Sequence, residues 1–277
     1  MSALALYIDG MVLLFGALIG SFLNVVIIRW PREMSIVKPR SSCPGCQTMI
    51  AWYDNIPILS WIILRGKCRT CGTSISVRYP MVEALTAFLS WLTFVRFVPT
   101  LADLSLASIL TYLFYFAFVS GLIAITFIDL EHYLIPNEIS LPAIPIGILG
   151  AWGLDLLGGE SVGIRSAALG ALAGGGSLWL LREVYYRIRG HEGMGLGDVK
   201  MMAMLGAFLG LHPALIFIVF VSSFLGSVVG ITAMVLHGKD MKHPIPFGPF
   251  LALAGLIYLY WGETLAPLFI PLAREFQ

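Results

Sequence analysis

The sequence predicts an all-α polytopic membrane protein with about eight transmembrane helices and a zinc-binding cytoplasmic loop between helices 1 and 2. Three observations lead to this prediction. Hydrophobic residues make up 58% of the 277 positions and charged residues only 12%, whereas an average soluble domain has about 25% charged residues. Long uncharged runs recur along the chain, and about 20 apolar residues suffice to cross a bilayer. Lys and Arg residues are concentrated in alternate connections, as the positive-inside rule requires.

Eight hydrophobic segments define the expected helices. They cover residues 7–28, 81–98, 105–128, 139–157, 164–186, 199–211, 213–236 and 247–270. The sixth segment is short and could form one broken unit with the seventh. On this basis we divide the chain into a first transmembrane helix (1–29), a cytoplasmic zinc-binding loop domain (30–80) and a membrane core (81–277).

The positions of Lys and Arg predict which side of the membrane each connection faces. If the amino end is outside, fourteen of the seventeen lie on the inner side, and only Arg96, Arg165 and Arg274 lie outside. The inner set is Arg29, Arg32, Lys38, Arg40, Arg65, Lys67, Arg69, Arg78, Arg182, Arg187, Arg189, Lys200, Lys239 and Lys242. Both ends of the chain are therefore expected to be periplasmic. The first segment does not resemble a cleaved signal peptide, because its basic residues follow it instead of preceding it.

The first segment carries a face of small residues. Gly16, Gly20 and Asn24 are spaced four residues apart and so share one side of a helix. Small residues at this spacing let helices approach closely, and an amide can hydrogen-bond a neighbouring helix. Asn24 lies near the cytoplasmic edge, where its side chain could instead contact a substrate.

The only four cysteines form two Cys-x-x-Cys pairs, Cys43 with Cys46 and Cys68 with Cys71, in the polar region after the first segment. This spacing is typical of a four-thiolate zinc site. A redox-active pair is the alternative, but the reducing cytosol argues against structural disulfides. Zinc would fold a loop that is too small to build its own core.

Two further features flank this site. Residues 52–64 are too short an apolar run to span a bilayer, and their aromatic residues suit the headgroup zone. The loop is therefore expected to lie against the membrane face. Glu83 stands at the start of the second segment, where the helix dipole favours an acid, so a structural and a functional role both remain open.

Two aspartates are expected at the cytoplasmic ends of apolar segments. Asp129 ends the third segment, where the negative pole of the helix dipole disfavours a carboxylate. Asp198 follows the glycines at 193, 195 and 197. An aspartate there could be an ordinary helix cap, but the glycines leave room for another backbone and Asp129 lies at the same membrane level. From the dipoles alone, we expect Asp198 to be the ionised member of the pair and Asp129 to hold the proton.

Paired carboxylates at a membrane edge favour proteolysis by a shared-proton dyad. One acid would act as general base on water while the other polarises the carbonyl oxygen. No His-Glu-x-x-His or Gly-x-Ser-x-Gly motif is present, and a net charge of +1 gives no reason to expect nucleic acid as a partner. Two alternatives to a protease are a proton- or ion-coupled transporter and a non-catalytic assembly factor of a secretion machine.

Taken together, the motifs resemble those of bacterial type IV prepilin peptidases, which are membrane aspartyl proteases of the Gly-x-Gly-Asp type that also N-methylate their products. The matching runs are Gly20-Ser21-Phe22-Leu23-Asn24-Val25, the two Cys-x-x-Cys pairs, Trp52-Tyr53-Asp54-Asn55-Ile56-Pro57, Arg78-Tyr79-Pro80-Met81-Val82-Glu83, Asp129 with Ile135-Pro136, Gly195-x-Gly197-Asp198-x-Lys200, and Pro246-Phe247-Gly248-Pro249-Phe250. They cover nearly the whole chain in order.

The resemblance implies a specific pair of reactions. The substrates would be prepilins or pseudopilins of type IV pili or type II secretion, with a short basic leader before an apolar helix. Asp129 and Asp198 would be the catalytic pair, cutting before that helix, typically after Gly, on the cytoplasmic side of the bacterial inner membrane. S-adenosylmethionine would then methylate the freed amine. The methyl-donor site is not assigned by the resemblance, and its candidate residues are Glu83, Trp52, Asp54 and Asn55.

Overall fold

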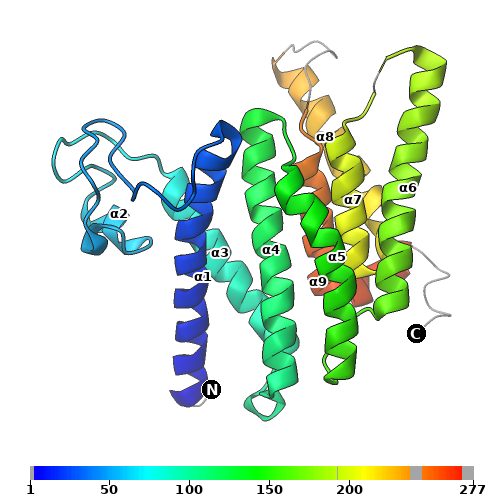
Figure 1. The fold of residues 1–277 in the computed structure, drawn as a ribbon, viewed down its shortest axis with the longest axis horizontal. Coiled ribbons are helices and arrows are strands. Elements are labelled where there is room, and N and C mark those ends of the chain that lie inside the picture. Colours follow the sequence, from blue (N-terminus) through cyan, green and yellow to red (C-terminus); the bar gives the residue numbers. More distant parts are fainter. Residues whose placement is uncertain (1–2, 192, 238–244, 270–277) are drawn as a thin grey trace. The chain divides into compact units, whose positions relative to one another are not determined.

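The protein is described by a computed structural model that covers residues 3–191, 193–237 and 245–269. In these ranges the chain is all-helical, with two isolated bridges as its only extended pairing. It forms two compact units, residues 1–104 and residues 105–277 (Figure 1). Each unit is considered by itself.

The first unit is built on two packed helices and a long loop. α1 (Ala3–Arg29) packs against α3 (Arg78–Phe97). The contact depends on small residues, because a Cβ at Gly16 would lie 2.7 Å from the Ala87 Cα and a Cβ at Gly20 would lie 2.7 Å from the Glu83 Cα. The small-residue face predicted for the first segment is therefore a helix-packing face. Its third member also bridges the two helices, since Asn24 Nδ2 donates to the Tyr79 carbonyl at 3.0 Å.

The loop between α1 and α3 contains only short helical turns. These are η1 (Trp30–Arg32), η2 (Trp52–Asp54) and α2 (Leu59–Ile63), and η3 (Leu101–Asp103) follows α3. The loop includes both cysteine pairs. Because it has so little regular structure, side-chain hydrogen bonds and the cysteine cluster must hold it together.

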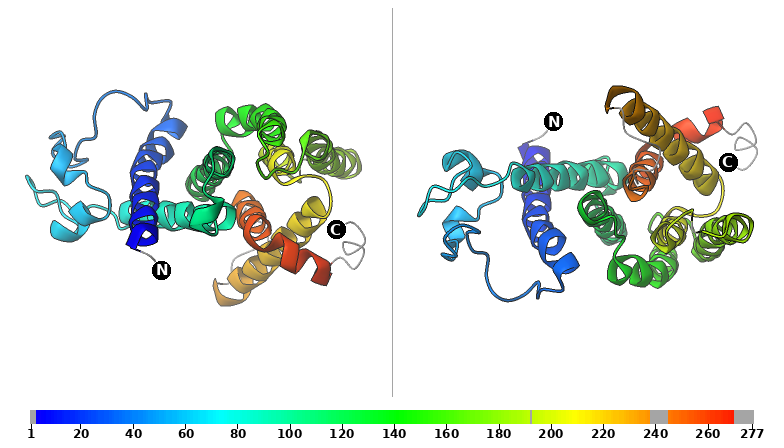
Figure 2. Two further views of the ribbon diagram at one scale, coloured as in Figure 1. Left: turned by 90° about the horizontal axis from the view of Figure 1, so that it is seen from below. Right: turned by 90° about the horizontal axis from the view of Figure 1, so that it is seen from above.

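In its described residues, the second unit is a bundle of six helices. They are α4 (Leu106–His132), α5 (Asn137–Leu156), α6 (Ile164–Arg189), α7 (Leu196–Leu209), α8 (Ala214–His237) and α9 (Gly248–Phe269). The short α7 packs against α5, α6, α8 and α9, and α4 packs against α5 and α9 (Figure 2). The end of α4 and the start of α7 lie at the same end of this bundle (Figure 1).

The central position of α7 follows from its composition. Its Met201, Met202 and Leu205 side chains are fully buried. Gly206 meets Gly170 of α6 so closely that a Cβ added at either glycine would collide with the carbonyl oxygen of the other. Such backbone-to-backbone contact holds helices together where lipid removes the hydrophobic drive for association.

The prediction of an all-helical membrane protein is confirmed, but its count of eight spanning helices is not. Each of the eight predicted segments contains a helix. In the described part of the chain, six spans are long and apolar enough to cross a membrane: Ala3–Arg32, Leu106–His132, Asn137–Leu156, Ile164–Arg189, Ala214–Leu236 and Gly248–Leu268. The other two helices are α3 and α7, and α7 has only 14 residues. The three-part division at residues 29 and 80 stays a prediction.

The glycine contact between α6 and α7 gives a test of this packing. We expect Gly206→Val to destabilise the protein by about 1–3 kcal/mol, as overpacking does, and to lower its midpoint of thermal unfolding in detergent. Gly176→Val on α6 is the control, because a Cβ at Gly176 meets nothing within 4 Å. Equal midpoints for the two variants would contradict the close α6–α7 contact.

Candidate active site and metal centre

Asp129 occupies the last turns of α4 and is only 5% exposed. Its Oδ2 atom accepts a hydrogen bond from the Gly248 N–H, at 3.0 Å. Gly248 is the first residue of α9, so the carboxylate of Asp129 lies at the positive end of that helix. This contact gives a buried acid a backbone donor from a segment 119 residues away.

A side chain at residue 248 would disturb this contact. An added Cβ would lie 2.6 Å from Asp129 Oδ2 and 3.2 Å from the Ile135 Cδ1 atom, so the carboxylate would have to move. Glycine therefore serves close approach to the acid here, and not an unusual backbone angle. Sequence reasoning missed this role, because nothing local connects Gly248 with an acid 119 residues away.

Asp198 lies in the first turn of α7, after the Gly195 N-cap. It is outside the six helices that are long enough to span a membrane. Burial and the negative charge of Asp129 together raise the pKa of Asp198 to about 6. The two predicted acids are thus close enough to influence each other's charge, as a shared-proton pair must be.

Ile135 connects the surroundings of the two acids. A Cβ added at Gly197 would lie 3.0 Å from the Ile135 Cβ, and one added at Gly248 would lie 3.2 Å from its Cδ1 atom. The side chain of Ile135, itself buried, therefore packs against the glycine before Asp198 and the glycine that donates to Asp129. The glycine at 197 provides clearance for this isoleucine, whereas the sequence had indicated clearance for another backbone.

The structure adds a second helix end to the charge argument made from the sequence. Asp129 was expected to hold the proton because it ends a helix, but it also faces the start of α9 and accepts its first N–H. Both features stabilise a negative charge on Asp129. Asp198 lies in the first turn of α7 and so has a helix start of its own, and which acid holds the shared proton stays a prediction.

A lysine of the same motif fixes the start of α7. Lys200 Nζ donates to Asn137 Oδ1 at 2.6 Å, which ties α7 to the first residue of α5. The motif alone could not reveal this partner, because Asn137 is 63 residues away in sequence.

The four cysteines converge as predicted. The Sγ atoms of Cys43, Cys46, Cys68 and Cys71 all lie within 4.8 Å of one another. Cys43 Sγ and Cys71 Sγ are 3.7 Å apart, close to the roughly 3.8 Å between thiolates that share one tetrahedral ion with metal–sulfur bonds of about 2.3 Å. The cluster could therefore hold a metal ion.

The two cysteine turns have the same local structure. In each, the backbone N–H of the first cysteine donates to a threonine carbonyl, from Cys43 to Thr48 at 3.0 Å and from Cys68 to Thr73 at 2.9 Å. The threonine hydroxyl in turn lies 3.3 Å from Cys46 Sγ in the first turn and 3.2 Å from Cys71 Sγ in the second. A hydroxyl in this position can donate to a metal-bound thiolate, and such outer-shell partners tune metal affinity.

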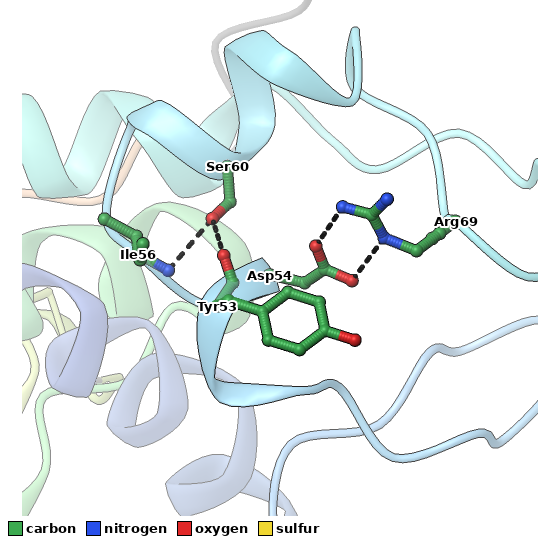
Figure 3. Close-up of polar contacts among 5 residues, drawn as sticks. All are labelled: Tyr53, Asp54, Ile56, Ser60 and Arg69. Atoms are coloured by element: carbon green, nitrogen blue, oxygen red, sulfur yellow. Dashed lines mark hydrogen bonds and ion pairs between the residues drawn. The ribbon is translucent and has the colours of Figure 1, made fainter.

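The four residues considered for the methyl-donor site differ in their surroundings. Asp54 accepts two hydrogen bonds from Arg69, at 2.8 and 2.6 Å (Figure 3), and these hold the pKa of Asp54 below its usual value. Glu83 is buried and accepts from the Ile58 N–H at 2.7 Å. The side chains of Trp52 and Asn55 are exposed.

The loop has an internal hydrogen-bond network around these residues. Ser60 Oγ accepts from the Ile56 N–H at 3.0 Å and donates to the Tyr53 carbonyl at 3.1 Å (Figure 3). Together with the Asp54–Arg69 ion pair, this network ties η2 to α2 and to the second cysteine turn. Asp54 and Glu83 therefore both have structural partners within the loop unit.

Comparison with known proteins identifies the family. Residues 14–97 match the family described as the bacterial peptidase A24 N-terminal domain. Residues 116–231 match the type IV leader peptidase family. The second match contains both Asp129 and Asp198, and the first contains all four cysteines.

Curated relatives match over nearly the whole chain. A prepilin leader peptidase/N-methyltransferase of Aeromonas salmonicida (strain A449) is 40% identical, with 92% of this chain and 91% of the relative covered. Proteins of the same name from Xanthomonas campestris and Neisseria gonorrhoeae are 37% and 38% identical, over 90% and 87% of this chain and 90% and 86% of theirs. No solved structure gives a significant match. The chain belongs to the type IV leader peptidase family.

The cysteine cluster can be tested without any assay of activity. We expect the purified protein to hold about one divalent metal ion per chain, measured by inductively coupled plasma mass spectrometry, and Cys46→Ser to lose it. Thr48→Val should weaken metal binding by about tenfold in a chelator competition, as loss of an outer-shell partner does.

Thr70→Val is the matched control, since Thr70 is an exposed threonine inside the second cysteine pair. Identical chelator competition curves for Thr48→Val and Thr70→Val would rule out the outer-shell role of Thr48.

Proposed function

We propose that this chain removes the leader from prepilins or pseudopilins at the cytoplasmic face of the bacterial inner membrane and then methylates the new amino terminus. The observation that carries the proposal is the pairing of Asp129 and Asp198 at one end of the second unit, around Ile135 and Gly248. The names of the relatives support the same substrates and both reactions. Nothing in the comparisons favours a transporter or a non-catalytic assembly factor.

We assign Asp129 as the base in hydrolysis because the Gly248 N–H stabilises its ionised form. Ionised Asp129 takes a proton from a water molecule as its oxygen attacks the scissile carbonyl carbon. Asp198 donates its proton to the carbonyl oxygen, which stabilises the tetrahedral intermediate. As the C–N bond breaks, the proton on Asp129 passes to the leaving amine and Asp198 regains its own. The Gly248 N–H keeps Asp129 oriented throughout.

The distribution of Lys and Arg supports the orientation. With both termini periplasmic, the end of α4 and the start of α7 face the cytoplasm, where the leader of a prepilin would enter. The basic residues Arg182, Arg187 and Arg189 end α6 on this side. The cysteine loop after α1 would face the cytoplasm too.

The metal of the cysteine cluster is proposed to be zinc with a structural role. Four thiolates at these separations suit tetrahedral Zn²⁺ and leave no open position for substrate. The ion would hold together a loop that has few regular elements, and no step of hydrolysis passes through it.

The methyl donor is proposed to be S-adenosylmethionine, bound at the loop around Trp52, Asp54, Asn55 and Glu83. Exposed Trp52 and Asn55 are available to contact it, while Asp54 and Glu83 hold the loop in place through Arg69 and Ile58. When bound, S-adenosylmethionine would supply an electrophilic methyl group to the freed amine, which would release a proton to solvent.

The aspartate pair is tested with purified enzyme and a prepilin in detergent. We expect Asp129→Asn and Asp198→Asn each to reduce cleavage by at least about a thousandfold, since each removes one half of the acid–base pair, and a gel shift measures the loss. Mass spectrometry of the product with S-adenosylmethionine follows methylation separately. Full-rate cleavage by either variant would refute the two-aspartate mechanism.

The role of Gly248 is tested by Gly248→Ala. The added Cβ would lie 2.6 Å from Asp129 Oδ2, so we expect displacement of the acid and a fall in kcat of about a hundredfold. Gly153→Ala on α5 serves as control, because a Cβ there meets nothing within 4 Å. If both variants cleave a prepilin at the same rate, Gly248 does not position Asp129.

A further inference from the structure

An apolar groove of about 1110 Å³ runs between α6 and α8, with α7 beneath it. Its walls include Ala173 and Ser177 on α6 and Ser223 and Ser227 on α8, and Met202 of α7 lies at its floor. Figures 1 and 2 show the ends of α6 and α8 nearest the start of α7 lying well apart. The mechanism of hydrolysis uses none of these residues.

One end of the groove lies near the candidate active site. Met202 lies four residues after Asp198, which is about one helical turn. On the α8 side, Ser227 follows Gly226, and an added Cβ at Gly226 would lie 3.7 Å from the Phe247 ring, next to Gly248. Both the floor and one wall of the groove are therefore continuous with the elements that carry the acid pair.

The groove then runs along α8 away from the acids. Its lining on α8 extends from Ser227 back to Leu215, and it ends at Leu211 and His212, beyond the far end of α7. Twelve residues from Ser227 to Leu215 correspond to about 18 Å at about 1.5 Å per residue. The groove is therefore elongated along the direction in which a substrate helix would leave the scissile bond.

The lining suits an apolar helix. Each wall has two small residues at a spacing of four, Ala173 with Ser177 and Ser223 with Ser227, which lets another helix approach closely. The hydroxyls of Ser177 and Ser227 already donate to the Gly174 and Ser223 carbonyls of their own helices. The large exposed side chains of Phe220 and Phe224 provide apolar contact area beside them.

We infer that this groove is the docking site for the apolar helix of the prepilin, which lies along α8 with its cleaved end near Asp198. The inference rests on the proposed function, because the substrate is taken to be cut just before an apolar helix. Lipid acyl chains would also fill an apolar groove. They would not account for its continuity with the acid pair.

A kinetic experiment tests the docking site with Ser223→Trp, because the larger side chain would fill the groove. Using a prepilin with its complete apolar helix as probe, we expect KM to rise about tenfold with kcat unchanged, since the contact is equal in ground and transition states. Thr232→Trp is the matched control. Thr232 is an exposed residue of α8, nine positions and so half a turn away from Ser223 around the helix, and its variant should match the wild type.

Photo-crosslinking provides a second reading that does not depend on turnover. With p-benzoylphenylalanine at position 224 in an Asp198→Asn background, we expect a covalent adduct with the apolar helix of the prepilin. The same group at position 179 should give none, because Trp179 is exposed on the other face of α6.

The outcomes distinguish failure of the docking inference from failure of the proposed function. If the wild type cleaves the prepilin but Ser223→Trp leaves KM unchanged, the groove is not the docking site. Adducts with lipid alone at position 224 would overturn the inference in the same way. If the wild type does not cleave the prepilin at all, the proposed function fails and this inference fails with it.

Discussion

The hydrogen bond from the Gly248 N–H to Asp129 is the contact on which the candidate site depends. It joins the end of α4 to the start of α9, and it exists only because residue 248 has no side chain. A buried carboxylate needs a donor, since leaving it unpaired costs a large desolvation penalty. The start of a helix supplies both the N–H and a favourable dipole. The contact therefore stabilises an ionised Asp129 despite its burial.

Close backbone packing explains the central place of α7. A helix of 14 residues is held in the bundle by packing on several sides and by the backbone contact between Gly206 and Gly170. In lipid such close packing replaces the hydrophobic effect as the source of association. It fixes the first turn of α7, with Lys200 bound to Asn137, so that Asp198 lies close enough to Asp129 to be affected by its charge. It also leaves one side of α7 at the floor of the groove between α6 and α8.

Much of this organisation could be predicted from the sequence, because it depends on local patterns. Apolar runs located every long helix, the cysteine spacing predicted the cluster, and the two helix-end aspartates predicted the acid pair. The contacts between distant segments were not predictable. Nothing local connects Gly248 with Asp129. The sequence argument about the shared proton considered only the helix that carries each acid, so it could not include the pole that α9 contributes at Asp129.

The two proposed reactions lie in different parts of the chain. Asp129, Asp198 and Gly248 belong to the second unit, whereas the cysteine cluster and the candidate methyl-donor residues belong to the first. Chemistry imposes the order between them. An amide nitrogen shares its lone pair with the carbonyl group and is a poor nucleophile, so the methyl group can be accepted only after hydrolysis has released a free amine. Under the proposed assignment, methyl transfer therefore acts on the product of hydrolysis, and a substrate helix retained in the groove would keep that product at the enzyme between the two steps.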